Sequence, residues 1–119
     1  MLPKELNIRL IATFPEIRET YEEETSWQEG DDTGAHVVYA DVFVPFIKQQ
    51  LKMRNEKVLE RIFVYIEEML CLGDEYAFEV VSLSVLESLL LDNEVDKVSV
   101  LDYAKKKTHQ EIDEIILRA

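Results

Sequence analysis

The apolar residues of the chain repeat at helical spacing, and between residues 74 and 91 they surround the helix instead of lining one side. In such a helix, Val80 and Leu83 fall on one stripe, while Val85 and Leu89 fall on another. The alternation Val-Ser-Leu-Ser-Val-Leu inside the segment also fits a strand, but eighteen residues without Gly or Pro exceed the usual strand length. We therefore predict a helix that is buried on several sides and forms the axis of the fold.

A second helix is predicted over residues 56–72, where apolar and charged side chains separate onto opposite faces. Gly73 suits the left-handed conformation that ends many helices, and Asp74 can accept hydrogen bonds from the free amides of the next helix. The two helices must pack antiparallel, because Gly73 leaves no room for a long connection. The predicted inward side chains are Leu59, Ile62, Phe63, Ile66, Met69 and Leu70, and the predicted outward ones are Glu60, Arg61, Glu67 and Glu68.

A third helix is predicted over residues 36–53, which are rich in Val, Tyr and Phe but carry apolar residues at helical spacing. Pro45 lies inside this helix, and proline removes one backbone hydrogen bond and clashes with the carbonyl four residues before it. We expect a kink or a restart near residues 41–44, with Asp41 as a candidate cap of the restarted helix.

The rest of the chain completes an all-α pattern in a single domain, residues 1–119. We expect a compact antiparallel helical bundle, or a short array of helical-repeat type, with about six helices. Pro15 separates the first two helices, and Thr108 is the predicted cap of the last one. The remaining predicted helices cover residues 2–14, 15–27, 97–106 and 108 onward, with loops over residues 28–35 and 92–96.

The charge of the chain excludes some partners and its cysteine content indicates a compartment. The chain has 25 acidic and 13 basic residues, a formal charge of −12 that argues against nucleic-acid binding because phosphates would be repelled. The single cysteine, Cys71, excludes an intramolecular disulfide, and we expect it in the core or at its boundary. We recognise no secretory signal and no membrane span, so we expect a cytoplasmic protein without a membrane partner.

The acidic residues concentrate in one segment, because eight acids and one base lie between Glu16 and Asp32. Such a segment is either a solvated helix face with a soluble loop, or a surface that steers a basic protein into contact. Trp27 lies in the same segment. It is either an aromatic anchor ringed by acids at an interface, or a ring that covers the core, which is the commoner role.

No pattern of residues indicates catalysis or metal binding, so we predict no catalytic residues, no metal site and no cofactor. Nucleophile and phosphate-loop motifs are absent, and the spacing of acids after Trp27 does not match a calcium loop. His36 and His109 stand too far apart for a shared helix face and are interpreted as surface residues. Glu79 and Glu87 could form an acid–base pair on the core helix, but we interpret them as solvated edges of it.

Three segments together resemble a known group of proteins. GAHVVYADVFVPFI, residues 34–47, precedes the predicted second helix, and GDEYAFEVVSLSVLESL, residues 73–89, follows it. Over residues 14–92 the chain resembles small uncharacterised bacterial all-helical proteins, and its hairpin is similar to one unit of an armadillo or HEAT repeat. The resemblance implies no catalytic residues. The residues of the second helix that carry it are Ile62, Phe63, Ile66, Glu67 and Met69.

Small, acidic helical proteins of this kind are similar to immunity proteins of bacterial toxin systems, and this similarity implies a non-enzymatic protein that neutralises a basic toxin by binding it. The alternative is a structural or regulatory interaction module whose acidic face only keeps it soluble. A third hypothesis, an enzyme that uses Glu79 and Glu87, would require both to converge in a pocket. The predicted partner-binding residues are Glu19, Tyr21, Glu22, Glu23, Glu24, Trp27, Glu29, Asp31 and Asp32.

Overall fold

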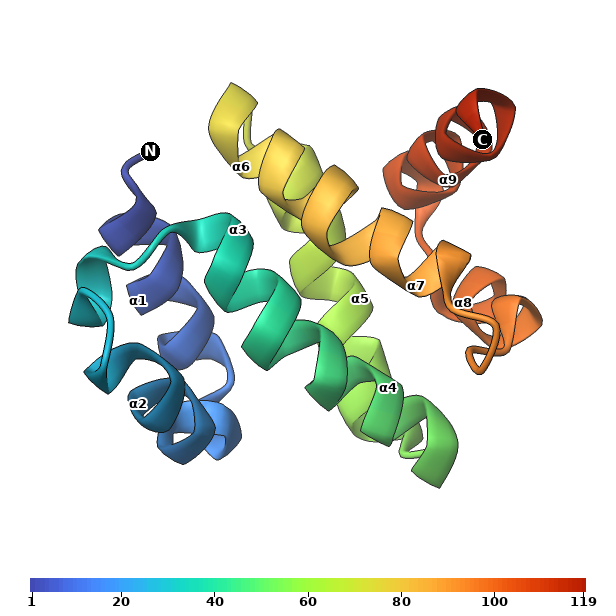
Figure 1. The fold of residues 1–119 in the computed structure, drawn as a ribbon. Coiled ribbons are helices and arrows are strands. Elements are labelled where there is room, and N and C mark those ends of the chain that lie inside the picture. Colours follow the sequence, from blue (N-terminus) through green and yellow to red (C-terminus); the bar gives the residue numbers. More distant parts are fainter.

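The computed structural model describes all 119 residues, and every regular element in it is helical, which confirms the predicted all-α class. At two places, residues 35–53 and residues 75–91, three consecutive elements join into one continuous helical rod (Figure 1). Counted in this way the chain forms seven helices, against the six or so predicted. None of them is both long and apolar enough to span a membrane. The elements are α1 (Pro3–Thr13), η1 (Pro15–Ile17), α2 (Arg18–Ser26), η2 (Gly30–Asp32), α3 (Ala35–Val38), η3 (Tyr39–Phe43), α4 (Val44–Met53), α5 (Glu56–Leu70), α6 (Glu75–Glu79), η4 (Val80–Leu86), α7 (Glu87–Leu91), α8 (Lys97–Tyr103) and α9 (Lys106–Arg118).

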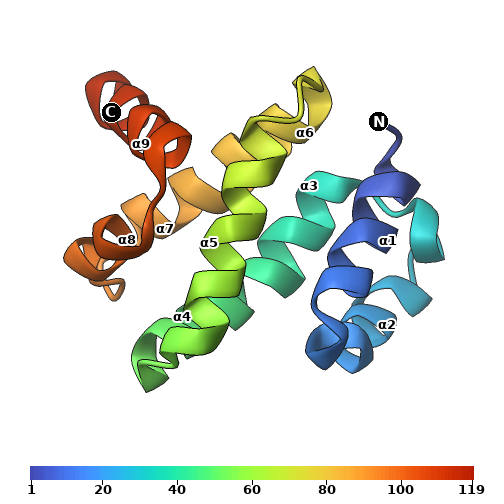
Figure 2. The ribbon, with the colours of Figure 1, turned by 180° about the vertical axis from the view of Figure 1, so that it is seen from behind.

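The rod α6–η4–α7 is the buried axis that the sequence predicts. Its side chains Val80, Val85, Leu86 and Leu89 are fully buried. Figures 1 and 2 show why, because α3–η3–α4 runs beside this rod and α5 crosses behind both in the view of Figure 1. One expectation is wrong: Leu83, assigned to an inward stripe, is 47% exposed. The rod therefore keeps one solvent-facing stripe, along which Glu75, Glu79, Leu83, Glu87 and Leu91 follow at intervals of four residues.

The turn between α5 and α6 has the predicted chemistry. Gly73 has a φ of 81°, in the left-handed region that residues with a Cβ rarely adopt. Asp74 then caps α6, because its carboxylate accepts a hydrogen bond from the amide of Tyr76 at 3.2 Å. The sequence signals at Gly73 and Asp74 are confirmed.

Pro45 changes the hydrogen bonding of its helix without breaking it. The turns before it, Tyr39–Phe43, are π-helical, so that the amide of Val44 donates to the carbonyl of Tyr39, five residues back. This shift absorbs the missing proline N–H. The expected cap is wrong, because Asp41 is exposed and the helix continues through it. A second π-helical segment, Val80–Leu86 in the core rod, has no proline and was not predicted.

The N-terminal helices are joined to the central rods by a cluster of aromatic rings. The ring of Phe14, where α1 ends, lies 5.3 Å from Phe43 and 5.5 Å from Tyr65. Beside it the hydroxyl of Tyr39 donates to the carbonyl of Leu6 at 2.8 Å and lies 2.7 Å from the hydroxyl of Tyr65. Since the single proton of Tyr39 goes to Leu6, Tyr65 is the donor in the second bond. These contacts fix α1, and with it α2, against the centre of the fold.

The last helix begins three residues earlier than a cap at Thr108 would place it, and it is capped from another helix. Thr108 is not its N-cap: it is fully buried in the first turn of α9. Instead the carboxylate of Glu67 on α5 accepts hydrogen bonds from the amides of Lys107 and Thr108, each at 2.9 Å, and from the Thr108 hydroxyl. The prediction that Glu67 faces solvent is therefore wrong, because it faces α9.

Candidate functional site

Helix α2 and the loop that contains η2 form an acidic surface at one side of the molecule, which we define as the predicted acids from Glu19 to Asp32 (Figure 1). All of them are exposed except Glu24, which is half-buried. None of them forms an ion pair, because the ion pairs of the structure use other carboxylates. The residues of the acidic surface are Glu19, Glu22, Glu23, Glu24, Glu29, Asp31 and Asp32.

Glu16, the first acid of the segment, is held by the fold and stands apart from the acidic surface. Its carboxylate accepts two hydrogen bonds from the guanidinium of Arg61, at 2.8 and 3.3 Å. Arg61 also donates to the carbonyl of Thr13 and lies over the ring of Phe14, 5.2 Å from its centroid. These bonds from Arg61 hold the pKa of Glu16 below its ordinary value. The pair therefore fastens the start of α2 to α5.

Trp27 lies at the C-terminal end of α2, next to the acidic surface, and is 73% exposed. The interpretation that it covers the core is wrong. An indole this exposed is uncommon on a protein that otherwise buries its large rings, such as Phe14, Phe43 and Phe63. The alternative role, an aromatic anchor among acids at an interface, stays a prediction.

Tyr21 is buried under the acidic surface and is therefore a support of it. Only 4% of the residue is exposed, as its predicted inward face requires, and its hydroxyl donates to Asp31 Oδ1 at 2.6 Å. Burial, and then the carboxylate of Asp31, raise the pKa of Tyr21 well above its ordinary value. Its assignment as a partner-binding anchor is corrected, because its ring is not accessible from solvent.

The loop of the acidic surface is ordered by a residue that sequence reasoning missed. Asn7 on α1 is fully buried, and its side-chain amide donates to the carbonyls of Asp31 and Thr33 at 3.0 and 2.7 Å. Thr33 in turn donates to the carbonyl of Gly30 at 2.7 Å, and Gly30 adopts a φ of 59°. The acids of the loop are thus displayed on a backbone that is already fixed. The only signal in the sequence was a polar residue on the inward face of a helix.

The other candidate residues do not come together into a site. Glu79 is exposed and Glu87 is half-buried on the solvent-facing stripe of the core rod, and neither makes a side-chain hydrogen bond. No group of three His, Cys, Asp or Glu side chains lies where it could hold a metal ion. Cys71 is exposed, which corrects the expectation that it lies in the core or at its boundary, and its thiol lies 3.8 Å from Glu67 Oε2.

The two histidines have separate environments. His36 is half-buried, with Nδ1 2.6 Å from the Ser84 hydroxyl and its ring edge-on to Tyr76. The expectation that it is a surface residue is therefore wrong in part. His109 is exposed, as expected, with Nε2 3.0 Å from the carbonyl of Leu101. Lys48 on α4 pairs with Asp92, outside the acidic surface.

Comparison with known proteins gave one match. A family model described as "Domain of unknown function (DUF7674)" matches residues 8–118. No curated protein and no solved structure matched the chain.

Proposed function

Because the chain belongs to the DUF7674 family, a domain of unknown function, we propose its role from its surface: it is a non-enzymatic protein that binds a basic protein partner. The observation that carries this proposal is the acidic surface, whose seven carboxylates have no basic partner within the chain. Trp27 beside it supplies the apolar contact that a purely electrostatic surface lacks.

The physical chemistry of association supports this role. Uncompensated charges of one sign attract a partner of the opposite sign over about a Debye length and raise the association rate. Rim charges contribute mainly to that rate, whereas a buried Trp contributes mainly to the lifetime of the complex. The ordering of the loop by Asn7 adds to affinity, since the backbone has little conformational freedom left to lose on binding.

Neutralisation of a basic toxin is the specific form of this role that we propose. A nuclease toxin needs a basic surface to hold phosphates, and an acidic protein can cover that surface. The same charge of −12 that repels nucleic acid would favour such a complex. A toxin-like gene beside the gene for this chain would identify the partner, whereas a regulatory module would have an unrelated neighbour.

The test first isolates a basic partner by pull-down from the native cell. It then compares binding of that partner to the natural chain and to a variant in which Glu22, Glu23, Glu24, Asp31 and Asp32 become Gln or Asn. Asn at position 31 keeps an acceptor for Tyr21. We expect association measured by stopped flow to slow by at least about tenfold at low salt, and its salt dependence to flatten.

A matched control variant carries the same change of charge elsewhere on the surface, at exposed acids without ion pairs. It should associate almost as fast as the natural chain at moderate salt. Equal rates for the two variants would refute the acidic surface as the binding site. The control acids are Glu68, Glu75, Glu79, Asp113 and Glu114.

The contribution of Trp27 is tested separately with Trp27→Ala. Because the ring is exposed in the free chain, the substitution should leave the free energy of unfolding within about 0.5 kcal/mol of its natural value. We expect the complex to dissociate faster by about 10-fold or more, with little change in the association rate. An unchanged dissociation rate would mean that the ring lies outside the interface.

A further inference from the structure

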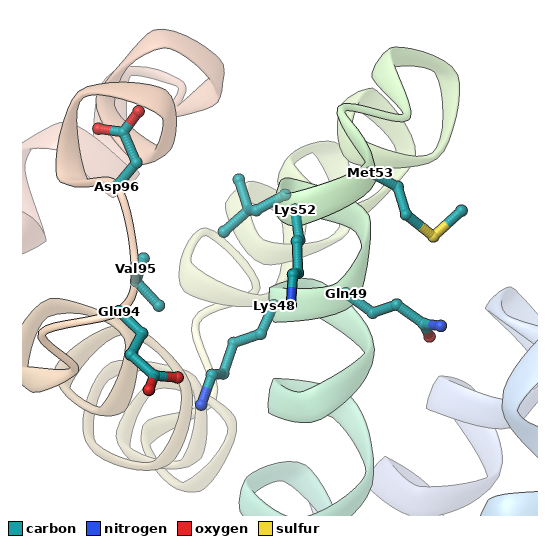
Figure 3. A pocket seen from close by; sticks show the side chains of 8 residues that line it. Lys48, Gln49, Lys52, Met53, Glu94, Val95 and Asp96 are labelled. Carbon is teal, nitrogen blue, oxygen red and sulfur yellow. The ribbon is translucent and has the colours of Figure 1, made fainter.

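A groove of about 720 Å³ separates α4 from the linker between α7 and α8. Figure 3 shows its two walls: Lys48 and Lys52 project from α4, and Glu94 and Val95 lie on the linker opposite. Leu51 and Val95 supply apolar surface between the charged groups. In Figures 1 and 2 the rod α3–η3–α4 lies between this linker and α2, so the groove is distinct from the acidic surface.

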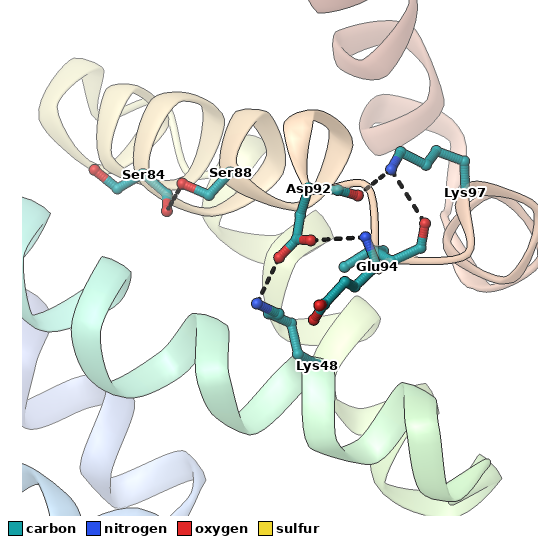
Figure 4. A network of polar contacts seen from close by, with 7 residues as sticks. Lys48, Ser84, Ser88, Asp92, Glu94 and Lys97 are labelled. Atoms are coloured by element: carbon teal, nitrogen blue, oxygen red, sulfur yellow. Dashed lines mark hydrogen bonds and ion pairs between the residues drawn. The ribbon is translucent and has the colours of Figure 1, made fainter.

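The linker wall is held in place by its own hydrogen bonds (Figure 4). The carboxylate of Asp92 accepts from Lys48 Nζ at 2.5 Å and from the amide of Glu94 at 2.8 Å. Lys97 donates to the carbonyls of Asp92 and Val95. Asp96 caps α8 through the amide of Val98, at 3.0 Å. A five-residue connection with this many contacts gives the groove a preformed wall.

Three charged side chains of the groove form no ion pair. They are Lys52 on α4, and Glu94 and Asp96 on the linker. The Asp96 carboxylate is used by the cap of α8, where it accepts from the Val98 amide and the Ser99 hydroxyl, so Glu94 is the linker carboxylate without a hydrogen bond. The groove also lies at a basic stretch of the chain, residues 48–57, where four bases accompany one acid. The groove therefore presents the ammonium of Lys52 on the α4 wall and the carboxylate of Glu94 on the linker wall. The apolar side chains of Leu51 and Val95 lie between them.

We propose that this groove binds a short peptide segment of a partner protein, in which an acidic and a basic side chain flank an apolar one. The acidic side chain pairs with Lys52, the basic one pairs with Glu94, and the apolar one contacts Leu51 and Val95. Charge complementarity carries this choice, because a ligand of one sign would leave one wall opposed by a like charge. A nucleic acid strand would meet Glu94 and the acidic rest of the chain. The inference is independent of the proposed function, since it concerns another surface.

The experiment titrates the isotopically labelled full chain with two blocked pentapeptides, acetyl-Asp-Gly-Leu-Gly-Lys-amide and the same peptide with Asp and Lys exchanged. We expect amide NMR signals of Leu51, Lys52, Glu94 and Val95 to shift, and one peptide to bind more tightly, because the charges lie on different walls. Replacing the Leu of the peptide with Ala should remove most of the shift. The absence of any shift at these residues with about 5 mM of either peptide would overturn the proposal.

Charge reversal gives the sharper test. Lys52→Glu and Glu94→Lys should each weaken binding of the preferred peptide by about fivefold, and the double variant should prefer the other peptide. Lys57→Glu and Glu79→Lys carry the same charge changes at exposed positions outside the groove and should leave the preference unchanged. The proposal is wrong if the controls act like the groove variants, or if free leucine binds as tightly as the peptides.

Discussion

Glu67 shows how a single side chain places a whole helix. Its carboxylate takes the hydrogen bonds that the first turn of α9 cannot make within the helix, and it lies at the positive end of that helix. Desolvation raises its pKa, but the bonds from the amides of Lys107 and Thr108 and from the Thr108 hydroxyl outweigh that effect, so the pKa of Glu67 lies below its ordinary value. The docking of α9 is therefore linked to pH.

We predict that Glu67→Gln lowers the free energy of unfolding at pH 7 by about 1 kcal/mol, the usual contribution of a helix cap. Because the pKa of Glu67 is depressed in the folded chain, the contribution of its charge is complete above its unfolded pKa and is lost as the pH falls through the folded value. The natural chain and Glu67→Gln should therefore have the same free energy of unfolding, measured with urea, below about pH 4. Glu68→Gln, at the exposed neighbouring position, should match the natural chain at pH 7.

The pair formed by Tyr39 and Tyr65 makes a second prediction at this scale. Burial, followed by the other hydroxyl, raises the pKa of Tyr39 far above its ordinary value, and burial raises the pKa of Tyr65 to about 12, so both stay neutral donors. Tyr39→Phe leaves the hydroxyl of Tyr65 without its acceptor and should cost about 1–3 kcal/mol in chemical denaturation. Tyr76→Phe removes a hydroxyl without a hydrogen bond and should cost much less.

Individual side chains were the hardest feature to predict from sequence. Periodicity assigns a residue to a face of its own helix, but it does not say which other helix covers that face. Glu67 and Asn7 are polar residues whose partners lie on distant segments, so pattern alone misplaced one and missed the other. Cys71 and Trp27 were misplaced for the opposite reason, since both follow the last covered turn of a helix and reach solvent.

At the scale of elements the sequence was more informative, because helix ends carry local chemistry. Pro15, Gly73 and Asp74 each act through their own backbone or through neighbouring amides, and the boundaries they predict are present. The π-helical segments were not predictable in the same way. Their extra residue per turn shifts the phase of the apolar pattern, which in residues 74–91 made the helix look apolar on all sides. The stripe that contains Leu83 is in fact exposed.

The core rod therefore contains two kinds of leucine, and they give a paired prediction. Leu86 is fully buried, so Leu86→Ala should lower the free energy of unfolding by about 2–5 kcal/mol through lost contacts and a cavity. Leu83 lies three residues away and is 47% exposed, so Leu83→Ala should cost less than about 1 kcal/mol. Thermal and urea unfolding of both variants measure the difference. Equal losses would mean that η4 is oriented differently about its axis.

For the whole molecule, the charged side chains fall into two groups: those that form ion pairs within the fold, and those that have no partner in the chain. Ion pairs such as Arg61–Glu16 and Lys48–Asp92 join elements that are distant in sequence. The acidic surface has no such pairs, and its like charges repel each other in the folded chain. Net charge and its clustering were visible in the sequence, but which acids remain unpaired depended on where Arg61 and Lys48 lie.

We predict that added salt stabilises this protein, because screening weakens the repulsion within the acidic surface more than it weakens the few ion pairs. The melting temperature should rise between about 20 and 500 mM sodium chloride, which bring the Debye length from roughly 20 Å to a few Å. In the variant with five neutralised acids the rise should be smaller and the starting temperature higher. If the melting temperature of the natural chain and that of the variant rise equally with salt, the repulsion does not come from the acidic surface.

The hydrogen bonds from Asn7 to the loop of the acidic surface have a consequence for time-resolved measurements. The amides of Asp32 and Thr33 donate to the carbonyls of Glu29 and Gly30, and Asn7 fixes the carbonyls of Asp31 and Thr33 from below. Although the loop lies at the surface, we expect these amides to exchange with deuterium far more slowly than those of an unanchored loop, and Asn7→Ala to remove that protection. A partner would then meet a loop that moves little between successive encounters, and its binding should follow a single exponential.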